Sequence, residues 1–319
     1  MSKNSNEPTV WNVGIHATGD ANVVNHGPAV GRIDGDVTIT PTAPPRTGPV
    51  ATADNKGAEV DVGILTVLAV EHAAVVNAMR GLRGYRTDRV SATGALVHHA
   101  EFGPPQSAIR VAVAQMPTPG NESAAVSYLE LMRALAPGVV VLVGIAGGIG
   151  KGVALGDVVL SDAVVLYDPR KVTADGVRHR GDSFVVSAAI RHRLNEFLVE
   201  TGGHVRDPHG EPVRVLMGPI GAGAAVIADR GSADREWLLE FNDKLLAVET
   251  ESAGMARAFH QVAGPTDRPF GWLAIRGISD LADGAKNDDH HESASRHAAA
   301  VAMHLLPHLS FHRSIDGRG

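Results

Sequence analysis

The chain has 319 residues, a formal net charge of −6 at pH 7 and no cysteine. The lack of cysteine excludes disulfides, thiolate catalysis and cysteine-based zinc sites, and the slightly acidic balance argues against non-specific nucleic-acid binding, which needs a basic surface. The N-terminus has no signal-peptide pattern and no apolar stretch is long enough to span a bilayer. We therefore expect a cytoplasmic location and neither a membrane nor a nucleic-acid partner.

Residues 1–57 differ in composition from the rest of the chain. Residues 1–40 are rich in Gly, Asn and Val, and short β-prone pieces alternate there with Asn-His-Gly and Asp-Gly turns. Residues 41–57 form a Pro-rich stretch with few large apolar side chains, as in extended linkers. We therefore expect a β-prone segment over 1–40, a linker over 41–57 and a folded domain over 58–319.

The folded domain alternates strand-like apolar runs with helical patterns. In chain order the predicted elements are a strand over 60–67, a helix over 70–82, strands over 87–99 and 109–115, a helix over 122–136, strands over 139–144 and 157–166, a helix over 187–201, a strand over 214–220, a helix over 235–243, a strand over 245–248, a helix over 252–261, a strand over 272–278 and a helix over 292–306. This alternation predicts an α/β fold around a mixed, largely parallel sheet.

Acidic residues follow three of the predicted strands. Glu71 comes just after the first strand, Glu249 and Glu251 follow the run that ends at Val248, and Asp280 follows the last strand. Open α/β sheets gather functional groups at the carboxyl ends of their strands, so these carboxylates are candidates for one shared crevice. Taken singly, each glutamate also suits an ordinary helix start, where the helix dipole favours negative charge.

A Gly-rich run over 143–150 follows the most apolar strand. The G-x-G-x-x-G spacing is absent and no helical pattern follows, which argues against dinucleotide binding. Glycine would let backbone N–H groups approach a ligand closely, but taken alone the run favours a tight connection between two strands.

Together these motifs resemble the nucleoside phosphorylase superfamily, and most closely its 5′-methylthioadenosine/S-adenosylhomocysteine nucleosidases. The matching pieces occur in the family's order: VGILTVLAVEHAAV, VGIAGGIG, ALGDVVLSD, GPIGAGAAVIAD, LAVETESAG and IRGISDLAD. The resemblance implies a three-layer α/β/α fold with a central mixed, twisted sheet. It also implies a purine nucleosidase that hydrolyses the N-glycosidic bond of an adenine nucleoside and releases adenine.

The resemblance assigns a role to each acidic position. Asp280 is expected to be the general acid that protonates N7 of the purine, with Ser279 orienting its carboxyl group. Glu71 is expected to hold and activate the attacking water, and Glu251 to bind the ribose hydroxyls. This chemistry is consistent, because the bond breaks through an oxocarbenium-like state and protonation makes the base a better leaving group. The other substrate-binding residues implied are Glu249, Thr250, Val226, Ile227, Ala146 and Gly147.

Two further features bear on the reaction and its substrate. Residues 66–70 include neither Arg nor Gly and lead into Glu71, which would repel phosphate, so water is favoured as the nucleophile. Thr250 stands where these nucleosidases usually have Met, and Val226 where they usually have Phe, which leaves methylthioadenosine in question while a purine remains expected. A phosphate-dependent purine nucleoside phosphorylase and a binding module without catalysis stay open as alternatives.

The segment over 1–40 loosely resembles the short amyloid-forming signalling motifs of some immune-type effectors and their receptors. A disordered tail or a small β-hairpin is the alternative interpretation. The resemblance implies a signalling partner that binds through residues 10–40, and an effector nucleosidase that acts on ATP or another adenine nucleotide. Basic residues that would then contact phosphate are Arg170, Lys171, Arg178 and Arg180.

The histidine-rich run over 288–292 raises the question of a metal. Adjacent residues rarely direct both side chains at one ion, and the implied reaction needs no metal, so we expect a solvated loop before the last helix. No metal site and no other cofactor is predicted. The resemblance also implies a homo-oligomer, whose size the sequence does not indicate.

Overall fold

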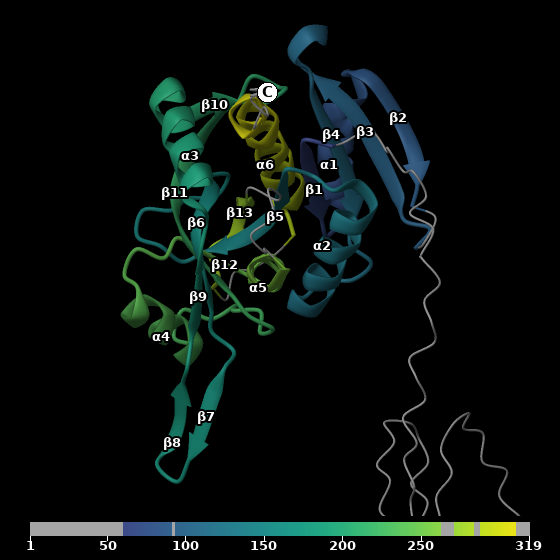
Figure 1. Cartoon of the computed structure of the whole chain (residues 1–319). Helices are drawn as coiled ribbons and strands as arrows, with labels where there is room; N and C mark the ends of the chain where they lie inside the picture. Colours follow the sequence, from purple (N-terminus) through teal and green to yellow (C-terminus); the bar gives the residue numbers. More distant parts are fainter. Residues whose placement is uncertain (1–59, 91–92, 263–270, 284–287, 311–319) are drawn as a thin grey trace, which may run out of the picture. The chain divides into compact units, whose positions relative to one another are not determined.

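The computed structural model describes residues 60–90, 93–262, 271–283 and 288–310. The predicted segments 1–40 and 41–57 lie outside the described residues, as do both ends of the predicted domain 58–319. Helices and strands alternate along the described chain (Figure 1). In chain order they are β1 (Val62–Thr66), α1 (Ala69–Arg80), β2 (Arg83–Arg89), β3 (Leu96–Phe102), η1 (Pro105–Ser107), β4 (Ile109–Gln115), α2 (Asn121–Leu135), β5 (Val139–Gly148), β6 (Val158–Leu166), β7 (Arg170–Thr173), β8 (Gly176–His179), β9 (Asp182–Val185), α3 (Ala188–Thr201), β10 (His204–Arg206), β11 (Pro212–Ala222), α4 (Ala233–Phe241), β12 (Ala247–Glu249), α5 (Ser252–Val262), β13 (Gly271–Asp280), α6 (His291–Leu305) and η2 (Leu306–Leu309).

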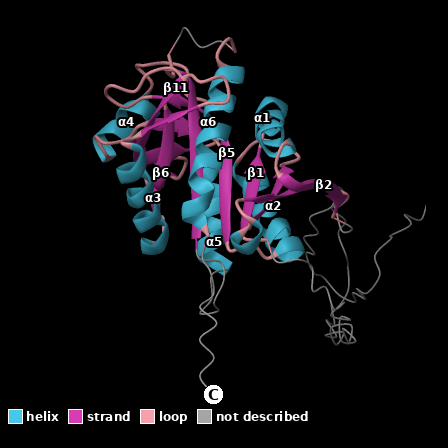
Figure 2. Cartoon of the chain, turned by 90° about the horizontal axis from the view of Figure 1, so that it is seen from above, coloured by secondary structure: helices cyan, strands magenta, loops and turns pink. Residues whose placement is uncertain are grey.

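Most of the strands join into one mixed sheet. Within the described residues this sheet has eleven strands, in the order β10-β11-β6-β13-β5-β1-β4-β3-β2, with β9 beside β6 and β12 beside β11 and β5. The central strands β4, β1, β5 and β13 run parallel, whereas β6 runs antiparallel to β13. Helices lie on both sides of the sheet (Figure 2). The predicted α/β class, with three layers around a central mixed sheet, is confirmed.

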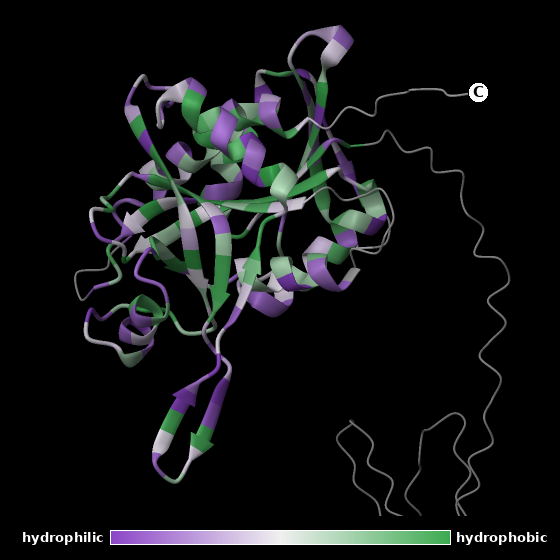
Figure 3. Ribbon diagram, turned by 60° about the vertical axis from the view of Figure 1, so that its left-hand side comes forward, coloured by the Kyte–Doolittle hydropathy of each residue, from purple (hydrophilic) through white to green (hydrophobic). Residues whose placement is uncertain are grey.

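The apolar core is centred on β5 and β13. Every residue of β13 is buried, and all but one of β5. Strands covered on both faces are largely apolar, and green and pale segments predominate among the strands in the middle of the ribbon (Figure 3). Each buried side chain of the size of Leu142 or Leu160 contributes about 1.5–3 kcal/mol. The rigid centre therefore fixes the ends of β5 and β13 relative to each other.

The six predicted helices lie within two residues of their expected bounds. Local signals set their ends: the hydroxyl oxygen of Ser187 caps α3 by accepting from Ile190 N–H, and that of Ser232 caps α4 by accepting from Arg235 N–H, each at 3.3 Å. Gly202 then ends α3 in the left-handed conformation, with φ +61°. None of the described helices has the length and apolar character needed to cross a membrane.

The single strand predicted over 87–99 is wrong. The chain forms two antiparallel strands there, β2 and β3, separated by a turn. Gly94 has φ +71° in this turn, and its N–H donates to the carbonyl oxygen of Val90 at 2.7 Å. The reversal is hard to read from the sequence because the turn holds neither Pro nor Asn and its Gly stands alone.

The stretch between the predicted strand over 157–166 and the predicted helix over 187–201, to which no element was assigned, contains the hairpin β7–β8 and the strand β9. β7 and β8 form a separate two-stranded sheet that turns at Gly176, where φ is +118°. Their side chains are mostly polar and exposed, so the hairpin lacks the apolar alternation that marks a half-buried strand. The three-residue strand β10 was missed for lack of length.

Candidate active site

One pocket lies at the carboxyl ends of the parallel strands β1, β5 and β13, where open α/β sheets place their ligands. All the residues predicted to be catalytic or to bind the nucleoside line it: Glu71, Ala146, Gly147, Val226, Ile227, Glu249, Thr250, Glu251, Ser279 and Asp280. The pocket therefore brings together side chains that are up to about two hundred residues apart in the chain.

Glu71 lies in the first turn of α1 and is 2 % exposed. One carboxylate oxygen accepts the backbone N–H groups of Val67 and Leu68, at 2.9 and 2.8 Å. The other oxygen accepts Ile145 N–H at 2.8 Å, so the side chain links the end of β1 to β5. Burial raises the pKa of Glu71, while nearby Arg276 and the three N–H donors act in the opposite direction.

Arg276 is a functional residue that the sequence reasoning missed. Its side chain is fully buried in β13 and donates to both Glu249 and Glu251, with 3.3 Å to the second carboxylate. Its charge also acts on Glu71. The signal was present in the sequence, because a single arginine interrupts the apolar run Gly271-Trp-Leu-Ala-Ile before Gly277, and a buried charge requires partners.

Glu249 and Glu251 both point toward Arg276, as expected for two side chains spaced by two residues. Glu249 accepts the backbone N–H of Ser252 at 3.0 Å and its hydroxyl at 2.6 Å, so protein donors already occupy this carboxylate. Burial raises the pKa of Glu249, Arg276 lowers it, and neighbouring Glu251 raises it further. Glu251 accepts from Thr250 and from Gly120 N–H, the latter at 3.1 Å.

Asp280 ends β13 immediately after an irregularity in the ladder. The register with β5 shifts between Ile278 and Asp280, which leaves Ser279 as the extra residue and re-aims the carboxylate. Asp280 is 6 % exposed, accepts Ala282 N–H at 2.8 Å and accepts the Ser279 hydroxyl at 3.3 Å. Ser279 thus lies where the sequence reasoning placed it, beside the carboxyl group of Asp280.

Most of the Gly-rich run over 143–150 is strand: residues 143–148 belong to β5, and only the last two begin the connection to β6. β5 continues to Gly148 and pairs there with β12. A Cβ on Gly144 would collide with Arg276 and lie 2.5 Å from a Glu71 oxygen, and one on Gly147 would lie 2.9 Å from an Asp280 oxygen. These glycines therefore let the charged side chains cross close over the backbone of β5.

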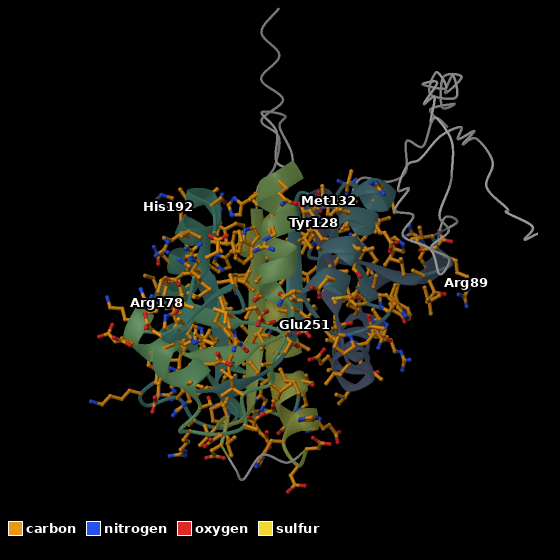
Figure 4. The ribbon with its side chains drawn as sticks, turned by 90° about the horizontal axis from the view of Figure 1, so that it is seen from below. Arg89, Tyr128, Met132, Arg178, His192 and Glu251 are labelled. Carbon is orange, nitrogen blue, oxygen red and sulfur yellow. The ribbon has the colours of Figure 1, made fainter. Side chains whose placement is uncertain are left out.

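The residues predicted to contact the purine line the pocket, whereas those predicted to contact phosphate do not. Val226 lines the pocket but is 63 % exposed, whereas Ile227 is buried. The four basic residues proposed to contact phosphate, Arg170, Lys171, Arg178 and Arg180, do not line this pocket. Figure 4 shows Arg178 at the periphery of the view and Glu251 well inside it. Among the lining residues that the sequence reasoning did not select, two have polar ring side chains, Tyr167 and His291.

Tyr167 and His291 enter the pocket from different elements. Tyr167 follows β6, and its hydroxyl donates to the carbonyl oxygen of Ala225 at 2.6 Å, which holds the segment that carries Val226. His291 begins α6, with Nε2 3.3 Å from Asp288. The expected solvated loop over 288–292 is thus correct for the exposed residues 288–290, but wrong for His291.

A second group of polar side chains joins the β10–β11 turn to α6. Ligand-type atoms of Asp207, Glu211 and His297 lie within 4.8 Å of one another. Arg296 donates to Asp207 at 2.6 Å and to Glu211 at 2.9 Å, so a protein cation already neutralises these carboxylates. The arrangement is an ion-pair cluster that ties α6 to the sheet edge.

The fold and the pocket define an α/β protein with a buried carboxylate–arginine site at its strand ends. The sequence profile of the Phosphorylase superfamily matches residues 89–307, and the chain belongs to this superfamily. The predicted family resemblance is therefore confirmed.

Individual relatives extend the comparison. The ATP nucleosidase Cap17 of Escherichia coli (strain KTE188) is 27 % identical over 264 residues, which cover 77 % of this chain and 50 % of that protein. The chain thus spans about half the length of that relative. The 5′-methylthioadenosine/S-adenosylhomocysteine nucleosidase of Anoxybacillus flavithermus is 29 % identical over 198 residues, or 60 % of this chain and 78 % of that protein.

Solved structures of such nucleosidases share the fold. The Neisseria meningitidis enzyme in complex with methylthio-immucillin-A has a TM-score of 0.60 at 21 % identity, over 77 % of this chain and 98 % of that one. The Streptococcus pneumoniae enzyme with a transition-state inhibitor has a TM-score of 0.61 at 23 % identity, over 78 % of this chain and all of that one.

Proposed function

We propose that this protein is a purine N-glycosyl hydrolase that releases adenine from an adenine nucleoside or nucleotide. The observation that carries the proposal is the convergence of Glu71, Glu251 and Asp280 on one pocket, with Arg276 buried behind the two glutamates. The relatives that match it by sequence are named as nucleosidases of ATP and of methylthioadenosine or S-adenosylhomocysteine, which supports the same reaction class.

The proposed mechanism uses three of the carboxyl groups in the pocket, those of Asp280, Glu251 and Glu71. Asp280 donates a proton to N7 of the base as the bond between C1′ and N9 breaks, and the bond electrons leave with adenine. Glu251 binds the ribose hydroxyls and, with Glu71, stabilises the positive charge that develops on the sugar. Glu71 then accepts a proton from the water that attacks C1′, which yields the free sugar. Arg276 acts as a positioning residue, because it holds Glu249 and Glu251 in place.

Water suits this site better than phosphate as the nucleophile. The backbone N–H groups of Val67, Leu68 and Ile145, which would otherwise be available to an anion, all donate to Glu71. Among the described residues that line the pocket there is no Arg or Lys. A phosphate ion in the place of the attacking water would therefore meet the Glu71 carboxylate with no Arg or Lys of the described lining beside it.

Two substrate classes remain candidates within this proposal. Methylthioadenosine or S-adenosylhomocysteine is one. ATP or another adenine nucleotide is the other, and two observations favour it: Val226 offers no aromatic surface at the pocket, and the match to the ATP nucleosidase runs over more of this chain than the match to the methylthioadenosine enzyme. In this second form the protein would act as an immune-type effector.

The proposal is tested by incubating the purified chain with methylthioadenosine, S-adenosylhomocysteine, adenosine, AMP and ATP, and measuring free adenine. We expect release without phosphate, and an Asp280→Asn variant should lose about two to four orders of magnitude of activity. Asp283→Asn is the matched control, because Asp283 lies outside the pocket lining and pairs with Arg230 at 2.8 Å. Adenine release that requires phosphate would identify a phosphorylase, and no release from any compound would favour a binding module.

Further parts of the proposal rest on the sequence. The chain is proposed to be a cytoplasmic homo-oligomer whose partner is a small purine nucleoside or nucleotide. Residues 10–40 are proposed to recruit an amyloid-motif signalling partner. These statements concern segments or contacts outside the described residues, and they follow from composition and resemblance alone.

A further inference from the structure

The charge in the pocket is unevenly distributed. Its described lining carries four carboxyl groups, on Glu71, Glu249, Glu251 and Asp280, and a single side chain able to carry positive charge, that of His291. Arg276 is buried behind the glutamates rather than in the lining. Any anionic part of a substrate would therefore be repelled from most of the pocket and has one group to approach.

The proposed binding mode determines where His291 lies relative to the substrate. The base is directed to Asp280, the ribose hydroxyls to Glu251 and the reacting face of the sugar to Glu71. The part of an adenine nucleoside without an assigned wall is the substituent on C5′. The described lining side chains without an assigned role are apolar, apart from Tyr167 and His291. The Tyr167 hydroxyl already donates to the carbonyl oxygen of Ala225, so His291 is the side chain left to offer a donor to this substituent.

We propose that His291 is the specificity-determining residue for the 5′ substituent and that it recognises a phosphoryl group, so that the substrate is a nucleotide. This inference rests on the proposed function, since it needs the base and ribose positions assigned there. An imidazolium ring has two N–H donors, and hydrogen bonds from a charged donor to phosphate are among the stronger ones that proteins form.

The surroundings of His291 suit this role. Its ring is mostly buried, with a side chain 22 % exposed, and Nε2 lies 3.3 Å from an oxygen of Asp288, which is 87 % exposed. Asp288 is the one ion-pair partner of the ring among the described residues. The second ring nitrogen can then donate to a phosphate oxygen. Asp288 orients the ring from the solvent side and is itself too exposed to oppose an anion strongly.

The N-terminus of α6 also favours an anion next to His291. His291 is the first residue of this fifteen-residue helix, and the N-cap residue, His290, makes no side-chain hydrogen bond to it. The N–H groups of a first helical turn and the helix dipole both favour negative charge. A phosphoryl group bound by the His291 ring would lie close to this N-terminus.

The test compares the wild type with His291→Ala and His291→Phe on three substrates: ATP, AMP and methylthioadenosine. We expect the wild type to release adenine from ATP or AMP, with both variants raising the KM for the nucleotide. The ratio of kcat/KM for nucleotide to that for methylthioadenosine should fall at least about tenfold in each variant. His290→Ala is the matched control, since that residue is exposed and does not line the pocket.

Three results would overturn the inference. A wild type that acts on methylthioadenosine but on neither nucleotide would refute it while leaving the nucleosidase proposal intact. Equal losses on all three substrates in both variants would assign His291 a structural role. Full nucleotide turnover by His291→Phe would show that the ring contributes packing rather than hydrogen bonds. Absence of adenine release from every substrate would instead remove the underlying function.

Discussion

Arg276 concentrates the electrostatics of the site in one side chain. This buried arginine faces Glu71, Glu249 and Glu251 and can neutralise only part of their charge. Backbone N–H donors stabilise part of the rest, and burial still raises the pKa of Glu71 and of Glu249. Removing the arginine would leave carboxylates buried without a cation, which usually costs about 3–5 kcal/mol. The arrangement therefore ties stability and chemistry to the same residue.

The pH dependence of activity should reveal this coupling. Glu71 must be ionised to accept a proton from water, so activity is lost as the pH falls through its raised pKa. Arg276 lowers that pKa, and Arg276→Met should therefore move the acid limb of the kcat/KM profile to higher pH, besides reducing kcat/KM by about 100-fold or more. Arg276→Lys keeps a charge and should shift the limb less. A Met variant whose lower activity came with an unmoved acid limb would contradict the electrostatic role.

At the scale of elements, the sequence was most informative where an apolar run is followed directly by an acidic residue. The apolar runs of β5 and β13 predicted two buried strands, and the acids that follow the first strand, the run ending at Val248 and the last strand predicted a shared edge. The sequence pattern did not predict three details: the register shift at Ser279, the continuation of β5 through its glycines, and the hairpin β7–β8. The side chains of this hairpin are mostly exposed and polar and do not alternate with apolar ones. The first two features depend on pairing between segments far apart in the chain, whereas the hairpin pairs neighbouring segments and is hidden by its lack of apolar alternation.

The packing of charged side chains over β5 requires that residue 144 has no Cβ. An added Cβ would press on both Arg276 and Glu71, and neither can move without losing a buried partner. We expect Gly144→Ala to abolish most adenine release and to lower the free energy of unfolding by about 1–3 kcal/mol, the usual cost of overpacking. Denaturant titration and the adenine assay measure the two effects.

Gly81 provides the matched control for this substitution. It lies at the end of α1 with φ −83°, and a Cβ there would contact nothing within 4 Å. Gly81→Ala should therefore leave activity unchanged and stability unchanged or slightly raised, because alanine restricts the unfolded chain. Equal effects of the two substitutions would mean that crowding at Gly144 is not what the glycine avoids.

At the scale of the whole molecule, the site and the core belong to the same part of the chain. The pocket lining runs from Val67 to His291, and the buried core from Val60 to Leu309. The sequence predicted this division through a change in composition near residue 58, since segments poor in large apolar side chains cannot bury enough surface to join a core. For the shorter N-terminal part, the resemblance to signalling motifs leads us to propose a separate task, recruitment rather than catalysis.

A chain of residues 58–319 should accordingly retain the kcat/KM of the 319-residue chain within about twofold. Its Tm should differ from that of the 319-residue chain by only a few degrees, because every described residue of the core and pocket remains. The full-length chain, but not the shorter one, should bind an amyloid-reactive dye after incubation, as a self-templating cross-β segment requires. Loss of adenine release on truncation would place part of the catalytic unit before residue 58. Equal dye binding by both chains would place the aggregating segment inside the folded domain, and in that case the β-prone composition of residues 1–40 would have no connection with signalling.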